Sequence, residues 1–156
     1  MTHAEKARDL FLSGCNCAQA VFGAFCDETG MDRETAMRLC SSMGAGMGGL
    51  REVCGAVSGA FLAAGLLLGD SGCDPQKKKE HYARLQALAQ RFQAQHGSLL
   101  CRDLLRSLQP GAVPAARTAA YYKTRPCAIF VEDMAELLDQ LLAEEKAKTG
   151  KARCEQ

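Results

Sequence analysis

The stretch Gly44–Gly69, GAGMGGLREVCGAVSGAFLAAGLLLG, decides the fold class of this chain. It begins with a cluster of glycines, passes Cys54, and includes an apolar run from Val53 to Leu68. The run shows no strict two-residue alternation and is too long for an ordinary buried strand, so it predicts a buried helix. Small residues recur in it, and Gly55 and Gly59 stand four apart on one helix face, where another backbone can come close.

Amphipathic segments on both sides of this run predict further helices. Thr2, Asn16 and Asp32 are suitable N-caps, and Gly97 is a suitable stop. The expected helices cover residues 2–12, 17–28, a segment after Asp32, 51–69, 75–96, 99–107 and 126–147. The sequence therefore predicts an all-α fold, a single-domain helical bundle around the central Gly/Ala-rich helix. That domain is expected over residues 1–148, with a polar C-terminal tail at 149–156.

Composition and charge narrow the function classes. The chain has 156 residues, of which 47% are hydrophobic and 24% charged, as in ordinary globular domains. A formal net charge of +1 gives no reason to expect nucleic acid or an anionic membrane as partner. The apolar run is shorter than the roughly 20 residues of a membrane span, and the start has no signal-peptide pattern. We therefore expect a cytoplasmic protein that does not cross a membrane.

Nine cysteines are the main clue to function in the composition. Their number is odd, and the chain is large enough to fold without disulfide bonds. Metal binding or redox chemistry is therefore favoured over a disulfide framework. No CxxC pattern occurs, so any metal ligands must come from separate helices, as in bundle sites. For any single cysteine, the simpler interpretation is a small buried hydrophobic residue.

The glycine cluster allows several interpretations. Gly44, Gly46 and Gly49 spell GxGxxG, but no strand precedes them, so the context of a dinucleotide site is missing. A close-packed connection is one alternative. The other is a turn whose backbone N–H groups stabilise anions such as thiolates. If the central helix begins near Gly49 or Leu50, the pKa of the Cys54 thiol is expected to be lowered.

Cys15 and Cys17 flank Asn16, the expected cap of the second helix. A helix N-terminus stabilises negative charge, so this position also favours the thiolate form. Two cysteines two residues apart do not share a helix face and need not act together.

Four cysteine segments resemble a known family. Cys54–Gly59, CGAVSG, resembles the central motif of the C_GCAxxG_C_C family of redox-active proteins, whose label has Gly-Cys-Ala where this chain has Cys-Gly-Ala. The family's first, third and fourth cysteine segments resemble residues 16–20, 101–105 and 126–131. The glycines of residues 44–49 also resemble the segment before its motif. The resemblance covers about residues 5–142.

The resemblance implies a site. A related domain occurs in split-Soret cytochromes, which have an iron–sulfur centre beside haem. That association implies a set of four thiolates, Cys17, Cys54, Cys101 and Cys127. Covalent haem is not implied, because the chain has no CxxCH motif. The remaining cysteines lie outside the four-cysteine pattern, namely Cys15, Cys26, Cys40, Cys73 and Cys154.

The leading hypothesis is a [2Fe–2S] cluster bound by these four cysteines, for electron transfer or redox sensing with an unidentified redox partner protein. The glycines expected beside the cofactor are Gly46, Gly48, Gly49 and Gly55. Three alternatives stay open: a metal-free thiol–disulfide redox protein with Cys54 in the bridge, a structural zinc domain with the same four ligands, and a helical interaction domain whose cysteines only pack. The apolar stripe of residues 126–147 could pack internally or form a homodimer. No hydrolase or transferase signature stands out.

Overall fold

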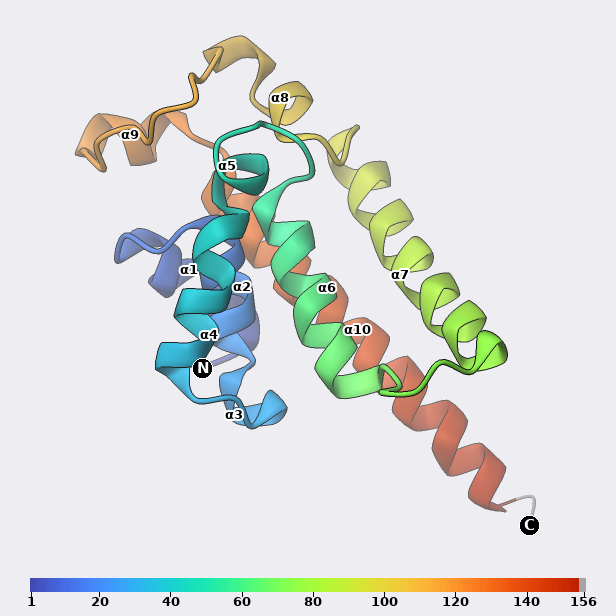
Figure 1. Ribbon diagram of the computed structural model, residues 1–156. Coiled ribbons are helices and arrows are strands. Elements are labelled where there is room, and N and C mark those ends of the chain that lie inside the picture. The colour runs from blue at the N-terminus through green and yellow to red at the C-terminus, as the bar shows by residue number, and fades with distance from the viewer. Residues whose placement is uncertain (155–156) are drawn as a thin grey trace.

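A computed structural model describes residues 1–154 and confirms the all-α fold (Figure 1). Its only β feature among these residues is an isolated antiparallel bridge between Val53 and Leu100. The helices, with two 3₁₀ turns labelled η, are α1 (His3–Leu12), α2 (Cys17–Ala24), α3 (Cys26–Thr29), α4 (Arg33–Cys40), η1 (Ser41–Met43), α5 (Gly44–Met47), α6 (Gly55–Leu68), α7 (Pro75–His96), α8 (Cys101–Leu104), η2 (Arg106–Leu108), α9 (Ala119–Thr124) and α10 (Cys127–Cys154).

Several helices begin or end at the capping residues that were expected from the sequence. Thr2 and Asn16 each form a capping box at the start of α1 and α2. The side chain of Asp32 accepts a hydrogen bond from the backbone N–H of Thr35 and caps α4. Gly97 ends α7 with a φ of 88°, a left-handed conformation that glycine adopts without steric cost.

The core lies where α1, α2, α6 and α10 pack against one another. A Cβ atom at Gly59 would lie 2.6 Å from the Ala18 carbonyl oxygen, and one at Gly55 would lie 3.1 Å from Cys17 Cβ. The close backbone approach predicted from these two glycines is therefore confirmed, with α2 as the partner helix.

The apolar stripe of α10 is buried inside the chain. Phe130, Met134, Leu138 and Leu141 are at most 7% exposed, and α10 contacts α1, α2, α6 and α7. The helix continues to Cys154, past residue 148, where a polar tail was expected. The end of that expected tail, residues 155–156, lies outside the described residues.

α7 packs on the outside of the bundle (Figure 1). Leu88 and Phe92 bury its inner face, and Arg84 forms an ion pair with Glu145 of α10 at 2.9 Å. Between α6 and α7 lies an apolar groove of about 290 Å³, which includes Val57 and Phe61. In the described part of the chain, no helix has both the length and the apolarity needed to cross a bilayer.

Three further helix boundaries differ from the expected ones. The second helix ends at Ala24 and is followed by the short α3, and the expected helix 99–107 divides into α8 and η2. The central helix begins at Gly55 and not at residue 51, because residues 45–51 wind largely left-handed. Non-glycine residues rarely adopt that conformation, so sequence patterns did not reveal it.

Candidate functional site

The four cysteines of the family pattern line one cavity. Cys17, Cys54, Cys101 and Cys127 border a space of about 300 Å³ at the end of the bundle where α2, α5, α6, α8 and α10 meet. Cys54, Cys101 and Cys127 are only 5–7% exposed, and Cys17 is partly exposed. Residues up to 110 positions apart in the sequence are thus brought to a single site.

Each of the four cysteines stands at the start of a helix. Cys17, Cys101 and Cys127 are the first residues of α2, α8 and α10, and Cys54 is the N-cap of α6. The unsatisfied N–H groups of a helix N-terminus give it a partial positive charge. The cavity is therefore surrounded by helix ends that favour a negatively charged occupant.

Backbone and side-chain hydrogen bonds fix three of the cysteine segments. The Asn16 side chain accepts from the Gln19 backbone N–H at 2.8 Å and donates to the Cys40 carbonyl at 3.3 Å, which ties the start of α2 to the end of α4. The N–H of Cys54 donates to the Leu99 carbonyl at 2.8 Å, and that of Cys101 to the Glu52 carbonyl at 2.7 Å. This small antiparallel bridge holds the starts of α6 and α8 side by side.

The glycine cluster forms a left-handed loop on the cavity wall. Gly46, Gly48 and Gly49 have φ values of 65°, 61° and 85°, and Ala45 and Arg51, which are not glycines, have 52° and 59°. A left-handed conformation costs a non-glycine residue about 1–2 kcal/mol, and such strain is concentrated at functional sites. Gly46, Gly48, Gly49 and Gly55, the four glycines expected beside a cofactor, all line the cavity.

The Cys17 and Cys127 thiols contact each other. A hydrogen bond between them, followed by burial, raises the pKa of Cys17 well above its usual value. The same hydrogen bond, with help from Arg125 and Arg117, lowers the pKa of Cys127 to about 7 despite its burial. The expectation that the helix start favours the Cys17 thiolate is therefore wrong, because the proton is held on Cys17 while Cys127 gains the thiolate character.

The Cys54 thiol is protonated at neutral pH. Burial raises its pKa to about 12, although the backbone N–H groups of Ala56 and Val57 act in the opposite direction. The expected lowering of the Cys54 pKa depended on a helix start near Gly49 or Leu50, whereas α6 begins at Gly55. Loss of solvent outweighs the helix N-terminus here, since a buried thiolate has few hydrogen-bond donors to replace water.

Three arginines border the cavity and were not anticipated from the sequence: Arg51, Arg117 and Arg125. Arg51 donates to Cys101 Sγ at 3.6 Å and twice to the Gly111 carbonyl, at 3.1 and 2.7 Å. The lining residues include no aspartate or glutamate. For Arg117 and Arg125 a sequence signal existed, because residues 99–126 have five basic residues and one acidic residue, but these positions are too dispersed to indicate a shared cavity.

Arg117 ties the loop before α9 to the bundle. Its guanidinium donates to the carbonyls of Phe11 and Cys15 at 3.4 and 3.1 Å and lies over the Phe11 and Tyr121 rings. Together with the Arg51–Gly111 contacts, this holds the loop of residues 109–118 against the cavity, where Ala112 and Pro114 are part of the lining. The loop thus forms part of the wall between the cavity and solvent.

The other five cysteines do not line the cavity. Cys40 is fully buried in the core, and burial raises its pKa to about 11. Cys15 and Cys26 are partly buried, while Cys73 and Cys154 are exposed. Substitutions of these residues can therefore serve as controls for substitutions of the four cavity cysteines.

The cavity cysteines surround a space and do not converge on one point. Among residues 1–154, no group of three or more His, Cys, Asp or Glu side chains is close enough to hold a single metal ion. The thiols of Cys17 and Cys127 interact, and the backbone segments that carry Cys54 and Cys101 are joined by the antiparallel bridge.

The fold and the cavity define an all-α protein with four dispersed cysteines around a buried, cationic site. The chain belongs to the C_GCAxxG_C_C family, described as "Putative redox-active protein (C_GCAxxG_C_C)", which matches residues 15–141. No curated protein and no solved structure matches the chain. The resemblance drawn from the cysteine segments is thus confirmed, and with it the redox-active class.

Proposed function

We propose that this protein binds a [2Fe–2S] cluster through Cys17, Cys54, Cys101 and Cys127 and acts in electron transfer or redox sensing. The observation that supports this most is that four helix starts, distant in sequence, each bring one cysteine to the same cavity. Four cysteine thiolates are the usual ligand set of such a cluster.

The charges around the cavity suit this cofactor. Two ferric ions, two sulfide ions and four thiolates sum to a dianion, which helix N-termini and guanidinium groups stabilise. Arg51 already contacts Cys101 Sγ, and Arg117 and Arg125 lower the pKa of Cys127. Protonated Cys17 and Cys54 must lose their protons on metal binding, so loading releases protons.

The spacing of the cysteines favours two metal ions over one. Structural zinc takes four ligands at about 2.0–2.3 Å around a single ion, which requires three or more cysteines in mutual reach. Each iron of a two-iron cluster needs only two thiolates. Cys17 and Cys127, whose thiols interact, would hold one iron, and Cys54 and Cys101, whose segments are joined by one backbone bridge, would hold the other.

When bound, such a cluster accepts and donates one electron at a time. The protein's own residues position and shield it. The left-handed loop with Gly46 and Gly49 forms one wall, and the loop of residues 109–118 forms another. Arg51 links the two walls, since its guanidinium contacts both Cys101 Sγ and the Gly111 carbonyl. Hydrogen bonds and charge near the ligand sulfurs tune the potential of such centres.

Anaerobic purification, with iron and sulfide analysis and absorption spectroscopy, tests the proposal. We expect coloured protein with equal amounts of iron and sulfide, lost on single replacement of each cavity cysteine by serine. Cys73→Ser is the matched control, because Cys73 is exposed and outside the cavity. Colourless, iron-free protein after reconstitution contradicts the proposal, and zinc in place of iron favours the structural zinc alternative.

A metal-free thiol–disulfide function is a second candidate, and the contact between Cys17 and Cys127 favours it. The thiolate of Cys127 attacks one sulfur of an external disulfide such as oxidised glutathione and releases one thiolate. Cys17 then attacks the mixed disulfide and releases the second. The two cysteines lose two protons and two electrons, and the external disulfide becomes two thiols. This pair differs from the bridge through Cys54 that the sequence suggested.

Peptide mapping of oxidised protein separates the two candidates. If the thiol–disulfide function operates, mild oxidation removes two thiols and yields a Cys17–Cys127 linked peptide, while Cys40→Ser leaves the result unchanged. An unchanged thiol count excludes this second candidate and leaves the cluster proposal standing.

A further inference from the structure

The cavity lies beneath a basic part of the chain. Residues 99–126, here called the basic cap, have five basic residues and one acidic residue, a net charge of +4. The rest of the chain has 14 basic and 17 acidic residues, a net charge of −3, because the totals are 19 and 18. Residues 75–96, which form α7, also have five basic residues and one acidic residue, a net charge of +4. The chain therefore has two basic segments, and of these the basic cap is the one that lines the cavity.

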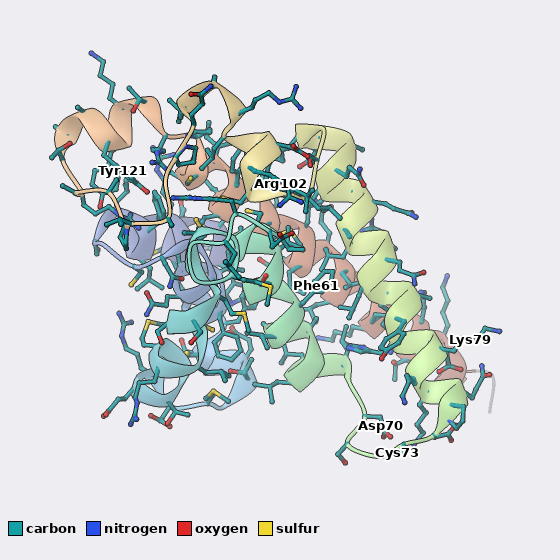
Figure 2. All side chains as sticks on the ribbon, turned by 45° about the horizontal axis from the view of Figure 1, so that its top comes forward. Phe61, Asp70, Cys73, Lys79, Arg102 and Tyr121 are labelled. Carbon is teal, nitrogen blue, oxygen red and sulfur yellow. The ribbon has the colours of Figure 1, made fainter. Side chains whose placement is uncertain are left out.

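The basic cap forms one end of the molecule. Figure 1 shows α8 and α9 together at this end, beside α5. Figure 2 shows Arg102 and Tyr121 at the cap. Lys79 and Cys73 lie far from the cap, at and just before the N-terminal end of α7. Leu105, Pro114 and Arg117 of the cap line the cavity, so the cap is also its cover.

The cationic groups of the cap are only partly neutralised. Arg102 pairs with Glu52 at 3.0 Å, and Arg106, 82% exposed, reaches Asp103 only at 4.0 Å. Among residues 1–154, Arg117 and Arg125 form no ion pair with a carboxylate. Arg117 donates to backbone carbonyls, and both guanidinium groups lie over the Tyr121 ring.

Three arginines outside the cap form close ion pairs with the last helix. Arg8, Arg84 and Arg91 each contact a glutamate of α10 within 2.9 Å. The cap differs from the equally basic α7 in its position, since residues of the cap line the cavity and residues of α7 do not. A dianionic cluster in the cavity halves the net charge of +4 and leaves the cap positive.

We propose that the basic cap is the docking surface for an acidic electron-carrier protein. This inference rests on the proposed function, since it names the partner class of the same site. Electron-transfer complexes have small, transient interfaces in which complementary charge guides the encounter. A positive surface directly over the redox site attracts an acidic carrier to the place where an electron has the shortest path.

Binding of flavodoxin, an acidic carrier, tests this proposal, with the basic cytochrome c as the opposite probe. We expect the full chain to bind flavodoxin at low ionic strength, to lose that binding as salt rises, and to ignore cytochrome c. The double variant Arg106→Glu/Lys123→Glu changes two exposed cap residues outside the cavity lining and should weaken binding about tenfold or more.

Lys78→Glu/Lys79→Glu is the matched control, because it makes the same charge change on exposed residues of α7. It should alter flavodoxin binding less than about twofold. Equal losses in both double variants, or wild-type protein that binds flavodoxin no better than cytochrome c, overturn the proposal. Binding is measured on metal-free and on reconstituted protein, so failure to find a cluster remains distinguishable from failure of the docking surface.

Discussion

Gly49 packs directly against Ala112 in the loop of residues 109–118, which forms part of the cavity wall. Its φ is 85°, and a Cβ atom there would lie 2.5 Å from the Ala112 carbonyl oxygen. Real Cβ atoms essentially never come so close to another heavy atom. The contact therefore requires glycine for two separate reasons, backbone conformation and space.

Gly49→Ala should loosen the loop of residues 109–118 and expose the cavity cysteines. The measurement is the rate of iodoacetamide labelling of Cys54 and Cys101 in metal-free protein, by mass spectrometry. Gly97→Ala is the control, because Gly97 has a φ of 88° but no atom within 4 Å of the added Cβ. Both variants should lose about 1–2 kcal/mol of stability from backbone strain. Equal labelling rates in the two variants would contradict this role of Gly49.

At the residue scale, the sequence was sufficient to predict features that depend on neighbouring residues, such as helix caps. Thr2, Asn16 and Asp32 cap helices as predicted, because an N-cap depends on three or four neighbouring residues. The ionisation of Cys54 was not predictable, since it depends on burial by segments far away in the chain. The arginines of the cavity were missed for the same reason.

α6 packs against α2 through glycines, which allow a short distance between the two helix backbones. A Cβ atom at Gly59 would lie 2.6 Å from the Ala18 carbonyl oxygen, so the two helices can approach only with glycine at this position. Further along the same helix, Gly65 is exposed and would place a Cβ atom in open space.

Gly59→Ala should destabilise the protein by about 1–3 kcal/mol, because the helices must move apart to admit the methyl group. Gly65→Ala should stabilise it by about 0.5–1 kcal/mol, since alanine is the better helix former. Urea unfolding of both variants measures the difference. A loss of stability in Gly65→Ala, or none in Gly59→Ala, contradicts the packing described for α6.

α7 is attached to the bundle by one narrow apolar face, with Phe92 at 0% exposure as its largest buried side chain. Phe92→Ala should cost about 3–5 kcal/mol, as large-to-small changes in cores do. Tyr82→Ala, at a residue 55% exposed on the same helix, should change stability by no more than about 0.5 kcal/mol. Thermal unfolding compares them, and similar losses would mean that α7 is not anchored through Phe92.

At the element scale, the sequence predicted which segments are helical but not where the central helix begins. The apolar run and the capping residues are strong local signals, and α6, α7 and α10 follow them. The left-handed loop includes Ala45, Met47 and Arg51, whose intrinsic preferences favour other conformations. Its conformation also depends on tertiary contacts such as the Arg102 N–H donating to the Arg51 carbonyl at 3.2 Å.

On the scale of the whole molecule, the N-termini of four helices meet at the cavity. If the proposed cluster is present, its removal by a chelator should lower the melting temperature by about 5–10 °C. A ligand at one hundred times its Kd contributes about 2.7 kcal/mol, and about 1 kcal/mol shifts Tm by about 2–4 °C at this size. Scanning calorimetry before and after chelation measures the shift, and Cys73→Ser should show the same difference. An unchanged melting temperature would show that the helix starts are held without the cofactor.

The position of Cys127 has a consequence for biosynthesis. Cys127 opens α10, and α10 packs against α1, the first helix of the chain. A ribosome makes Cys17, Cys54 and Cys101 earlier, so a growing polypeptide has three of the thiols before the fourth exists. If the proposed cluster is present, the nascent chain therefore has an incomplete ligand set for it, and the cluster can be completed only after translation has passed the start of α10.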